Sequence, residues 1–289
     1  MQPCAKSLIL DLLSTLRRGA MPVRALVEAG ELFGIGENSL RVALARLRAA
    51  GLVERDERGQ YALGARAQAV NQQVTTWRQL EARMRPWRRG WIGVQSGAHS
   101  RSDRPALRRR IRALHLLGFR KLVPGLELRP NNLAGGVPAV RTQLHTLGVE
   151  PNALVFGVSE LDQDAEQRAH ELWDVAGLCA AYEKTQRELE ASAERLPSLE
   201  RNAAMVESFL LGGRAIRQLV LDPLLPESIA PAAPRRALLE ALRRYDRLGR
   251  ACWAGRLGDS VKTPRSTPAN LGGLDATEHL VVPMTGDAR

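Results

Sequence analysis

The segment ENSLRVALARLRAAGLVERDERGQYALG, Glu37–Gly64, decides how the N-terminal part of this chain folds. Apolar residues recur in its first half at positions i, i+3, i+4 and i+7, the spacing of one helix face, and these are Leu40, Ala43, Leu44 and Leu47. The opposite face carries small, polar or cationic residues that need no core: Ser39, Arg41, Val42, Ala45 and Arg46. Asn38 or Ser39 is expected to cap this helix, and Gly51 to end it.

Two short strands, LVERD and QYAL, follow the helix and are joined by a turn through Arg58 and Gly59. Upstream, Ser7–Arg17 predicts a first helix with Leu8, Leu12 and Leu16 on one face. Met21–Gly34 predicts a second helix with Pro22 in its first turn. Three helices and a charged hairpin in this order predict a winged helix-turn-helix over residues 1–66. Its helix would enter a DNA major groove and its wing would touch phosphates. The candidate DNA-binding residues are Asn38, Ser39, Arg41, Arg46 and Arg48 on the helix, and Arg55 and Arg58 on the wing.

The composition narrows the class of partner. The 289 residues carry a formal net charge of +11, which favours a polyanion. Thirteen Arg and one Lys stand against three acidic residues between positions 78 and 129, whereas twelve acidic residues stand against four basic ones between 150 and 200. The apolar runs are short and broken by arginine, the N-terminus does not read as a signal peptide, and Cys4, Cys179 and Cys252 have no metal-ligand spacing. We therefore expect a cytoplasmic protein with no membrane segment, no metal and no cofactor.

The rest of the chain predicts an α+β multidomain protein. Residues 67–84 read as a connector. Residues 85–162 alternate strand and helix and suggest a ferredoxin-like domain, in which Asp103 and Pro105 open a helix whose buried stripe is Leu107, Ile111, Leu114 and Leu116 or Leu117. Residues 163–256 are helical, with Asp174 as a cap and a weak point at Gly212–Gly213. Residues 257–289 lack periodicity and are expected to be a disordered tail.

Four pieces in order resemble the PaaX-type bacterial transcriptional regulators, a family named for a repressor of phenylacetate degradation. They are SLRVALARLRAAGLVERDERGQYALG, LLGFRKLVPGLELRPNNL, ELWDVAGLCAAY and LVLDPLLPESIAP. The resemblance implies a winged helix, a central domain similar to the Cas2 ferredoxin-like fold and a helical C-terminal domain. It also implies operator binding by a homodimer, with repression relieved by an acyl- or aryl-coenzyme A thioester.

A small anionic effector of this kind would need arginine for its phosphates and an aromatic surface for its rings. The candidate effector-binding residues are Arg108, Arg109, Arg112, Arg120, Lys121, Trp173 and Tyr182. The basic run, residues 101–121, can equally be a solvated helix face or a contact to flanking DNA phosphates, and aromatic residues at these spacings more often belong to the core.

The sequence thus predicts a transcriptional regulator that binds a double-stranded DNA operator and has no catalytic residues. Two other classes stay open. A Cas2-like metal-dependent nuclease would need an acidic ligand at the end of the first central strand, and WIGVQSGAHS offers none. A non-catalytic dimerising scaffold would bind no DNA.

Overall fold

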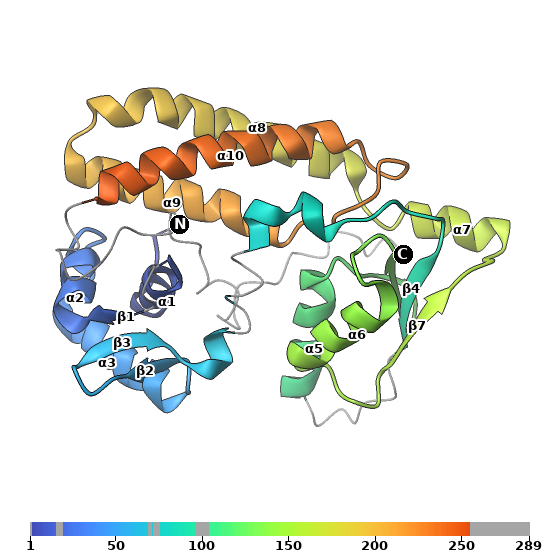
Figure 1. Cartoon of the computed structure of the whole chain (residues 1–289), viewed down its shortest axis with the longest axis horizontal. Coiled ribbons are helices and arrows are strands. Elements are labelled where there is room, and N and C mark those ends of the chain that lie inside the picture. The colour runs from blue at the N-terminus through green and yellow to red at the C-terminus, as the bar shows by residue number, and fades with distance from the viewer. Residues whose placement is uncertain (1, 16–19, 69–70, 72–75, 96–103, 255–289) are drawn as a thin grey trace, which may run out of the picture. The chain divides into compact units, whose positions relative to one another are not determined.

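The computed structural model describes residues 2–15, 20–68, 71, 76–95 and 104–254 (Figure 1). The protein is α+β and mostly helical, with two small antiparallel sheets. Contacts divide the described residues into two compact units: those within 1–75, 187–217 and 240–254 form one, and those within 76–186 and 218–239 form the other. The division along the sequence into five segments stays a prediction, and the expected tail, together with part of the connector, lies outside the described residues.

The first unit begins with three helices and a three-stranded sheet. Its elements are α1 (Ala5–Thr15), β1 (Ala20–Pro22), α2 (Val23–Glu31), α3 (Glu37–Ala49), β2 (Val53–Arg55) and β3 (Gln60–Leu63). The sheet order is β1-β3-β2, and both pairings are antiparallel. Three helices and a hairpin are therefore present in the predicted order, although Leu16 of the first helix lies outside the described residues.

The start of the second helix differs from the prediction. Met21 is fully buried in a strand and pairs with Tyr61, and Pro22 precedes the first turn of α2 instead of lying within it. The physical reason is that a proline before a helix favours extended backbone, and its missing N–H is no loss at the edge of a three-stranded sheet.

At the ends of α3, the predicted N-cap is wrong and the predicted C-terminal glycine is confirmed. Gly36 precedes the helix and no side chain caps it, so neither Asn38 nor Ser39 has the predicted capping role. At the other end Gly51 has φ +68°, a conformation that glycine adopts without strain. The amide of Gly51 donates to Arg48 O and that of Leu52 to Leu47 O, both at 2.9 Å, and this pair of bonds closes the helix.

The second unit contains a four-stranded sheet crossed by two helices. Its elements are β4 (Trp91–Gln95), α5 (Arg104–Leu116), β5 (Arg120–Val123), β6 (Leu126–Pro130), α6 (Gly136–Thr146) and β7 (Leu154–Val158). The strand order is β5-β6-β4-β7, every neighbouring pair is antiparallel, and one helix lies in each long connection. KLVPGLELRP, predicted as a single strand-like segment, is a hairpin of two strands that turns at Pro124–Gly125.

The buried face of α5 is not the predicted one. Leu107 and Ile111 are 42% and 56% exposed, so they do not form the core stripe, although Leu114 and Leu117 are buried as expected. The buried residues at positions i, i+4 and i+7 are instead Ala106, Arg110 and Ala113. Small side chains suit a helix that packs closely on its neighbours, and the charge of Arg110 is matched by Glu150 at 2.8 Å. Asp103, the predicted opening residue, lies outside the described residues.

The last third of the chain is helical. Its main elements are α7 (Gln163–His170), α8 (Val175–Arg195), α9 (Arg201–Val220) and α10 (Ala232–Trp253), with short 3-10 turns at η1 (Thr76–Gln79), η2 (Glu81–Arg83) and η3 (Leu196–Ser198). Asp174 caps α8 as predicted, because its Oδ1 accepts from the amide of Gly177 at 2.8 Å. The helix α9 continues through Gly212 and Gly213 without a break.

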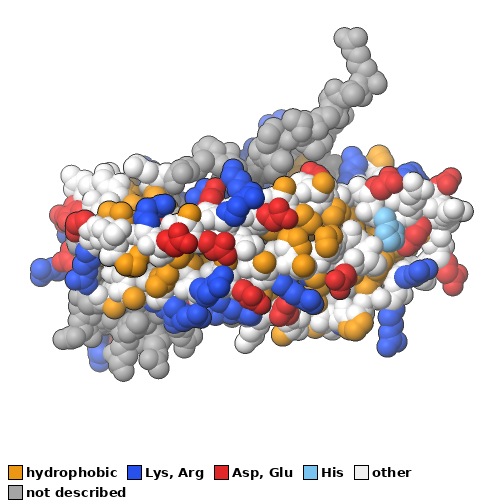
Figure 2. Space-filling view, turned by 90° about the horizontal axis from the view of Figure 1, so that it is seen from above, with side chains coloured by type: hydrophobic (Ala, Val, Ile, Leu, Met, Phe, Trp, Pro, Cys, Tyr) orange, Lys and Arg blue, Asp and Glu red, His pale blue; other side chains and the backbone are white. Residues whose placement is uncertain are grey.

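Within the first unit, buried side chains join α8, α9 and α10. The hydroxyls of Ser192 and Tyr245 lie 2.8 Å apart, and the indole N–H of Trp253 donates to Met205 O at 3.2 Å. Acidic and basic side chains are interspersed on the face shown in Figure 2. Glu188 pairs with Arg214 in this unit, so acidic residues of α8 are partly neutralised by neighbouring helices.

Candidate nucleic-acid interface

The helix α3 is held by one face and presents the other to solvent. Leu40, Leu44 and Leu47 are each at most 2% exposed and anchor the helix in the core of the first unit. The exposed residues of the helix lie away from this core: Glu37, Asn38, Ser39, Arg41, Val42, Ala45, Arg46, Arg48 and Ala49.

Helical spacing orders these exposed residues into a strip with two flanks. Positions 38, 42, 45 and 49 follow i, i+4, i+7 and i+11, so they run along the middle of the exposed face. Arg46 lies on one side of this strip and Arg41 and Arg48 lie on the other. Val42 is 50% exposed at the centre. A short apolar strip flanked by guanidinium groups suits a DNA groove, in which base edges lie between two rows of phosphates.

The side chain of Arg41 is engaged along its own helix. Its guanidinium lies 2.6 Å from a carboxylate oxygen of Glu37, one turn earlier, and both side chains are more than half exposed. An exposed ion pair of this kind contributes little to stability and is screened by salt. Arg41 can therefore exchange Glu37 for a phosphate at small cost.

The hairpin of β2 and β3 carries the other two candidate residues. Asp56 holds its turn, since its Oδ1 accepts from the amide of Gln60 at 2.7 Å. Both Arg55 and Arg58 are exposed, and the guanidinium of Arg55 lies 6.0 Å from the centre of the Tyr61 ring. The hairpin thus presents two cations beside a stable turn.

Backbone contacts tie the hairpin to the end of α3. The amide of Gly64 donates to Leu52 O at 2.9 Å, and Arg66 donates to Ala50 O at 2.8 Å. A side chain at position 64 would place its Cβ 2.5 Å from Gly51 O, so only glycine permits this approach. All seven candidate residues consequently belong to one continuous piece of structure.

A protein family is similar to this part of the chain. A family model described as PaaX-like protein matches residues 4–67. We refer to these residues as the PaaX-like segment. The PaaX-like segment runs from α1 past β3 and contains all seven candidate DNA-binding residues.

One solved structure resembles much more of the chain. It is an uncharacterized protein, Rv0674 from Mycobacterium tuberculosis, which is 22% identical, with a TM-score of 0.54 over 86% of this chain and 99% of that one. At this identity the likeness shows a shared fold only. The search of curated proteins gives no match.

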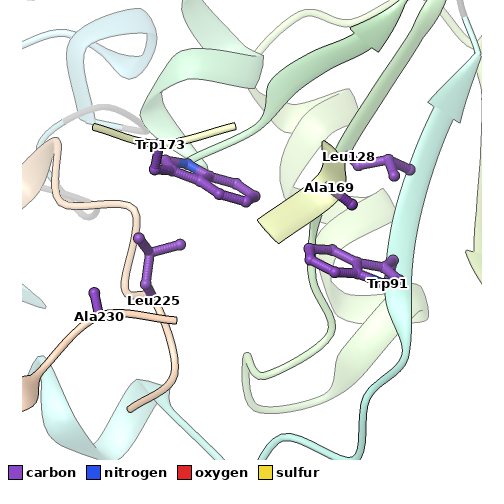
Figure 3. Close-up of a cluster of buried hydrophobic side chains, with 6 residues drawn as sticks. All are labelled: Trp91, Leu128, Ala169, Trp173, Leu225 and Ala230. Carbon is purple, nitrogen blue, oxygen red and sulfur yellow. The ribbon is translucent and has the colours of Figure 1, made fainter. Parts of the chain in front are cut away.

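Outside the PaaX-like segment, the two predicted aromatic effector contacts lie in the core of the second unit. Trp173 is 6% exposed and belongs to a buried cluster with Trp91 and Leu128 (Figure 3). Its ring is parallel to that of Trp91 within 4°, with centroids 6.3 Å apart, and its N–H donates to Gly118 O at 3.3 Å. These contacts favour the core interpretation of Trp173.

Tyr182 is likewise engaged in the interior. It is 2% exposed, and its hydroxyl donates to Oδ2 of Asp222 at 2.5 Å. Burial, with the negative charge of Asp222 as a second cause, raises the pKa of Tyr182 well above its ordinary value. The phenol therefore stays protonated and serves as a fixed donor to Asp222.

The five predicted cationic effector contacts lie on α5 and β5. Arg108, Arg109 and Lys121 are exposed, whereas Arg112 and Arg120 are half-buried. Burial lowers the pKa of Arg120, whose guanidinium donates to Phe119 O at 2.9 Å. Trp173 contacts the Gly118 turn just before β5, so it lies near Arg120, while Tyr182 is held at Asp222 instead.

Two other arginines of the segment 78–129, absent from the predicted set, are buried. Arg110 and Arg129 are 2% and 1% exposed. Arg129 donates to Leu117 O, to Pro130 O at 3.0 Å and to Oδ1 of Asn132 at 3.0 Å. Burial, reinforced by the nearby charge of Arg83, lowers the pKa of Arg129 to about 9, and the group still carries its charge at neutral pH.

Two further observations concern membrane helices and metal ligands. Among the helices of the described residues, none is both long and apolar enough to cross a bilayer. In the same part of the chain, no three His, Cys, Asp or Glu side chains gather as metal ligands would.

Proposed function

We propose that this chain is a DNA-binding transcriptional regulator whose first 66 residues form a winged helix-turn-helix. In this proposal α3 enters the major groove, with Asn38, Ser39, Arg41, Arg46 and Arg48 facing bases and phosphates, and Arg55 and Arg58 on the wing contact the backbone. The observation that carries the proposal is the exposed face of α3, an apolar strip between guanidinium groups that three buried leucines hold in place. The PaaX-like match over the same residues supports it.

The rest of the proposal concerns assembly and control. One recognition helix reads too few base pairs to find a site in a genome, so the regulator binds its operator as a homodimer, typically as a repressor of a catabolic gene cluster. The order β5-β6-β4-β7 supports a ferredoxin-like, Cas2-like middle domain. An acyl- or aryl-coenzyme A thioester would release the DNA. The regulator has no catalytic step: β4, Trp91–Gln95, carries no carboxylate to hold a nuclease metal.

Fluorescence anisotropy with labelled DNA from upstream of the chain's own gene tests the proposal. The wild-type protein should bind with two chains per duplex, and a panel of acyl-coenzyme A compounds should reduce the affinity. Arg46→Ala should weaken binding by about 1–3 kcal/mol, roughly 5- to 150-fold, because a lost base or phosphate contact is not replaced. Arg187→Ala is the matched control, since Arg187 is an exposed arginine of α8 in the same unit.

If Arg46→Ala and wild type bind the DNA with equal affinity at moderate salt, α3 is not part of the interface. If no upstream fragment binds and the protein is a stable dimer in solution, a dimerising scaffold is the better interpretation. Magnesium-dependent loss of the labelled DNA would instead reveal a nuclease.

A further inference from the structure

A cavity of about 680 Å³ lies within the second unit, and none of the residues assigned to DNA or effector lines it. Two stretches about 140 residues apart in sequence line it: η2 with the segment after it, and residues 226–228 with the first turn of α10. The wall residues that matter here are Met84, Arg85, Trp87, Pro226, Arg235 and Arg236. A neighbouring cavity of about 540 Å³ shares Arg85 and adds Arg88. The volume is within the range of small-molecule sites.

One wall is aromatic and rigid. The indole N–H of Trp87 donates to Gly90 O at 2.6 Å. Its ring meets that of Trp91 edge-on, with centroids 5.2 Å apart and an interplanar angle of 75°. Met84 and Pro226 extend this wall with apolar surface. A flat apolar group can pack here without reordering the tryptophan, because the ring is already held.

The facing wall is cationic and equally ordered. Arg235 is 7% exposed, and its guanidinium donates to Leu225 O at 3.2 Å and lies 3.8 Å from Asp222. Arg236 lines the rim at 60% exposure and lies 3.3 Å from Glu81. Arg85 is oriented by a 2.6 Å bond to Oδ1 of Asn131.

The start of α10 adds to the positive potential of this wall. Ala232 begins a 22-residue helix whose first turn contains no acidic residue. The free amides of a helix N-terminus carry a partial positive charge and attract anions. Two carboxylates at the rim, Glu81 and Glu227, oppose this charge, but Glu81 is already paired with Arg236.

Buried charges behind the cationic wall strengthen the preference of the cavity for anions. The interior carboxylate of Asp222 interacts with three guanidinium groups, those of Arg83, Arg129 and Arg235. Charges in a poorly hydrated region are weakly screened, so they act on a nearby cavity more strongly than surface charges do.

We infer that this cavity binds an organic anion, with a flat apolar group against Trp87 and one carboxylate or phosphate at Arg235, Arg236 and the first turn of α10. Arginine suits both head groups, since its planar fork donates two parallel bonds to either. The inference does not rest on the proposed DNA binding, because the cavity residues lie outside the PaaX-like segment and binding is measured without an operator.

Calorimetry on the full chain with four small probes tests the inference. Benzoate and phenyl phosphate present the two head groups on the same ring, benzyl alcohol lacks the charge, and inorganic phosphate lacks the ring. At least one of the two aromatic anions should bind with a dissociation constant below about 10 mM. The anion that binds identifies the preferred head group. Benzyl alcohol and inorganic phosphate should each bind at least tenfold more weakly than that anion.

The variant Arg236→Gln should weaken the aromatic anion about tenfold without unfolding the protein, since this side chain is exposed. Arg247→Gln is the matched control, because Arg247 is an exposed arginine three turns further along α10 and does not line the cavity. Three results would overturn the inference: no binding of either aromatic anion, equal binding of inorganic phosphate, or equal effects of the two substitutions. Intact operator binding in such a case would leave the proposed function standing.

Discussion

The arginines of the PaaX-like segment and those of residues 78–129 differ in where the fold places them. Arg41, Arg46 and Arg48 project from an exposed helix face. Arg110 and Arg129, by contrast, are at most 2% exposed and are bonded to a carboxylate or to several carbonyl oxygens. The segment with the larger charge surplus in the sequence therefore exposes only part of that charge.

The difference teaches that arginine can hold a domain together as readily as it can bind DNA. A guanidinium has five donors in a rigid fork, so it can satisfy backbone carbonyls at the ends of several elements at once. Arg129 does this for Leu117, directly after α5, and for Pro223, between α9 and α10. Net charge along a sequence is evidence of surface potential only after such interior groups are subtracted.

The substitution Arg129→Met tests the difference between buried and exposed arginines most strongly. It should destabilise the protein by about 3–5 kcal/mol, because the carbonyl oxygens of Leu117 and Pro223 and the Asn132 amide would lose a buried donor. Urea unfolding gives the change, and Arg108→Met, at an exposed position of α5, should alter stability by less than about 0.5 kcal/mol. Similar values for both variants would mean that Arg129 is not a structural residue.

Neighbouring residues of α5 sharpen the contrast. Arg110→Met should cost about 2 kcal/mol, since it leaves Glu150, whose side chain is only 21% exposed, without its cation. Arg109→Met, one residue earlier and exposed, should be nearly neutral. Adding Glu150→Gln to Arg110→Met should recover part of the loss. A loss that is additive in this double variant would show that the two groups are not coupled.

The smallest expected effect belongs to the hairpin of β2 and β3. Arg58→Gln should leave stability within about 0.5 kcal/mol of wild type, because the side chain lies on an exposed turn. It should nevertheless lower the slope of log affinity against log salt by about one, as expected for one lost phosphate contact. An unchanged slope would place Arg58 outside the interface and leave the exposed arginines of α3 as the cationic contribution.

The sequence was informative where one periodicity dominates. The leucines of α3 predicted its buried face, and Gly51 predicted its end, because both signals are local. The three-residue strand β1 was missed, since its partner strand lies about 40 residues away. The stripe of α5 was misassigned because its core positions use alanine and a paired arginine, while two large apolar residues, Leu107 and Ile111, face solvent.

The two sites differ in the same way. The candidate DNA-binding residues fall within about twenty positions, so their spacing alone predicts that they share a helix and a hairpin. The anion cavity joins Trp87 to Arg235, and no local pattern connects them. The buried contacts of Trp173 and Tyr182 also depend on partners far away in sequence, Gly118 and Asp222, which periodicity does not reveal.

The close approach of Gly64 to Gly51 has a consequence for protein engineering. Main-chain bonds and this glycine contact attach the hairpin to the end of α3, and leucines on the far side anchor the helix. The outward side chains at positions 38, 42, 45, 46 and 49 therefore contribute little to holding the fold. These side chains can therefore be substituted while the structure that supports them stays the same. A library restricted to these positions should change which DNA is recognised while every member still folds, provided that both glycines are kept.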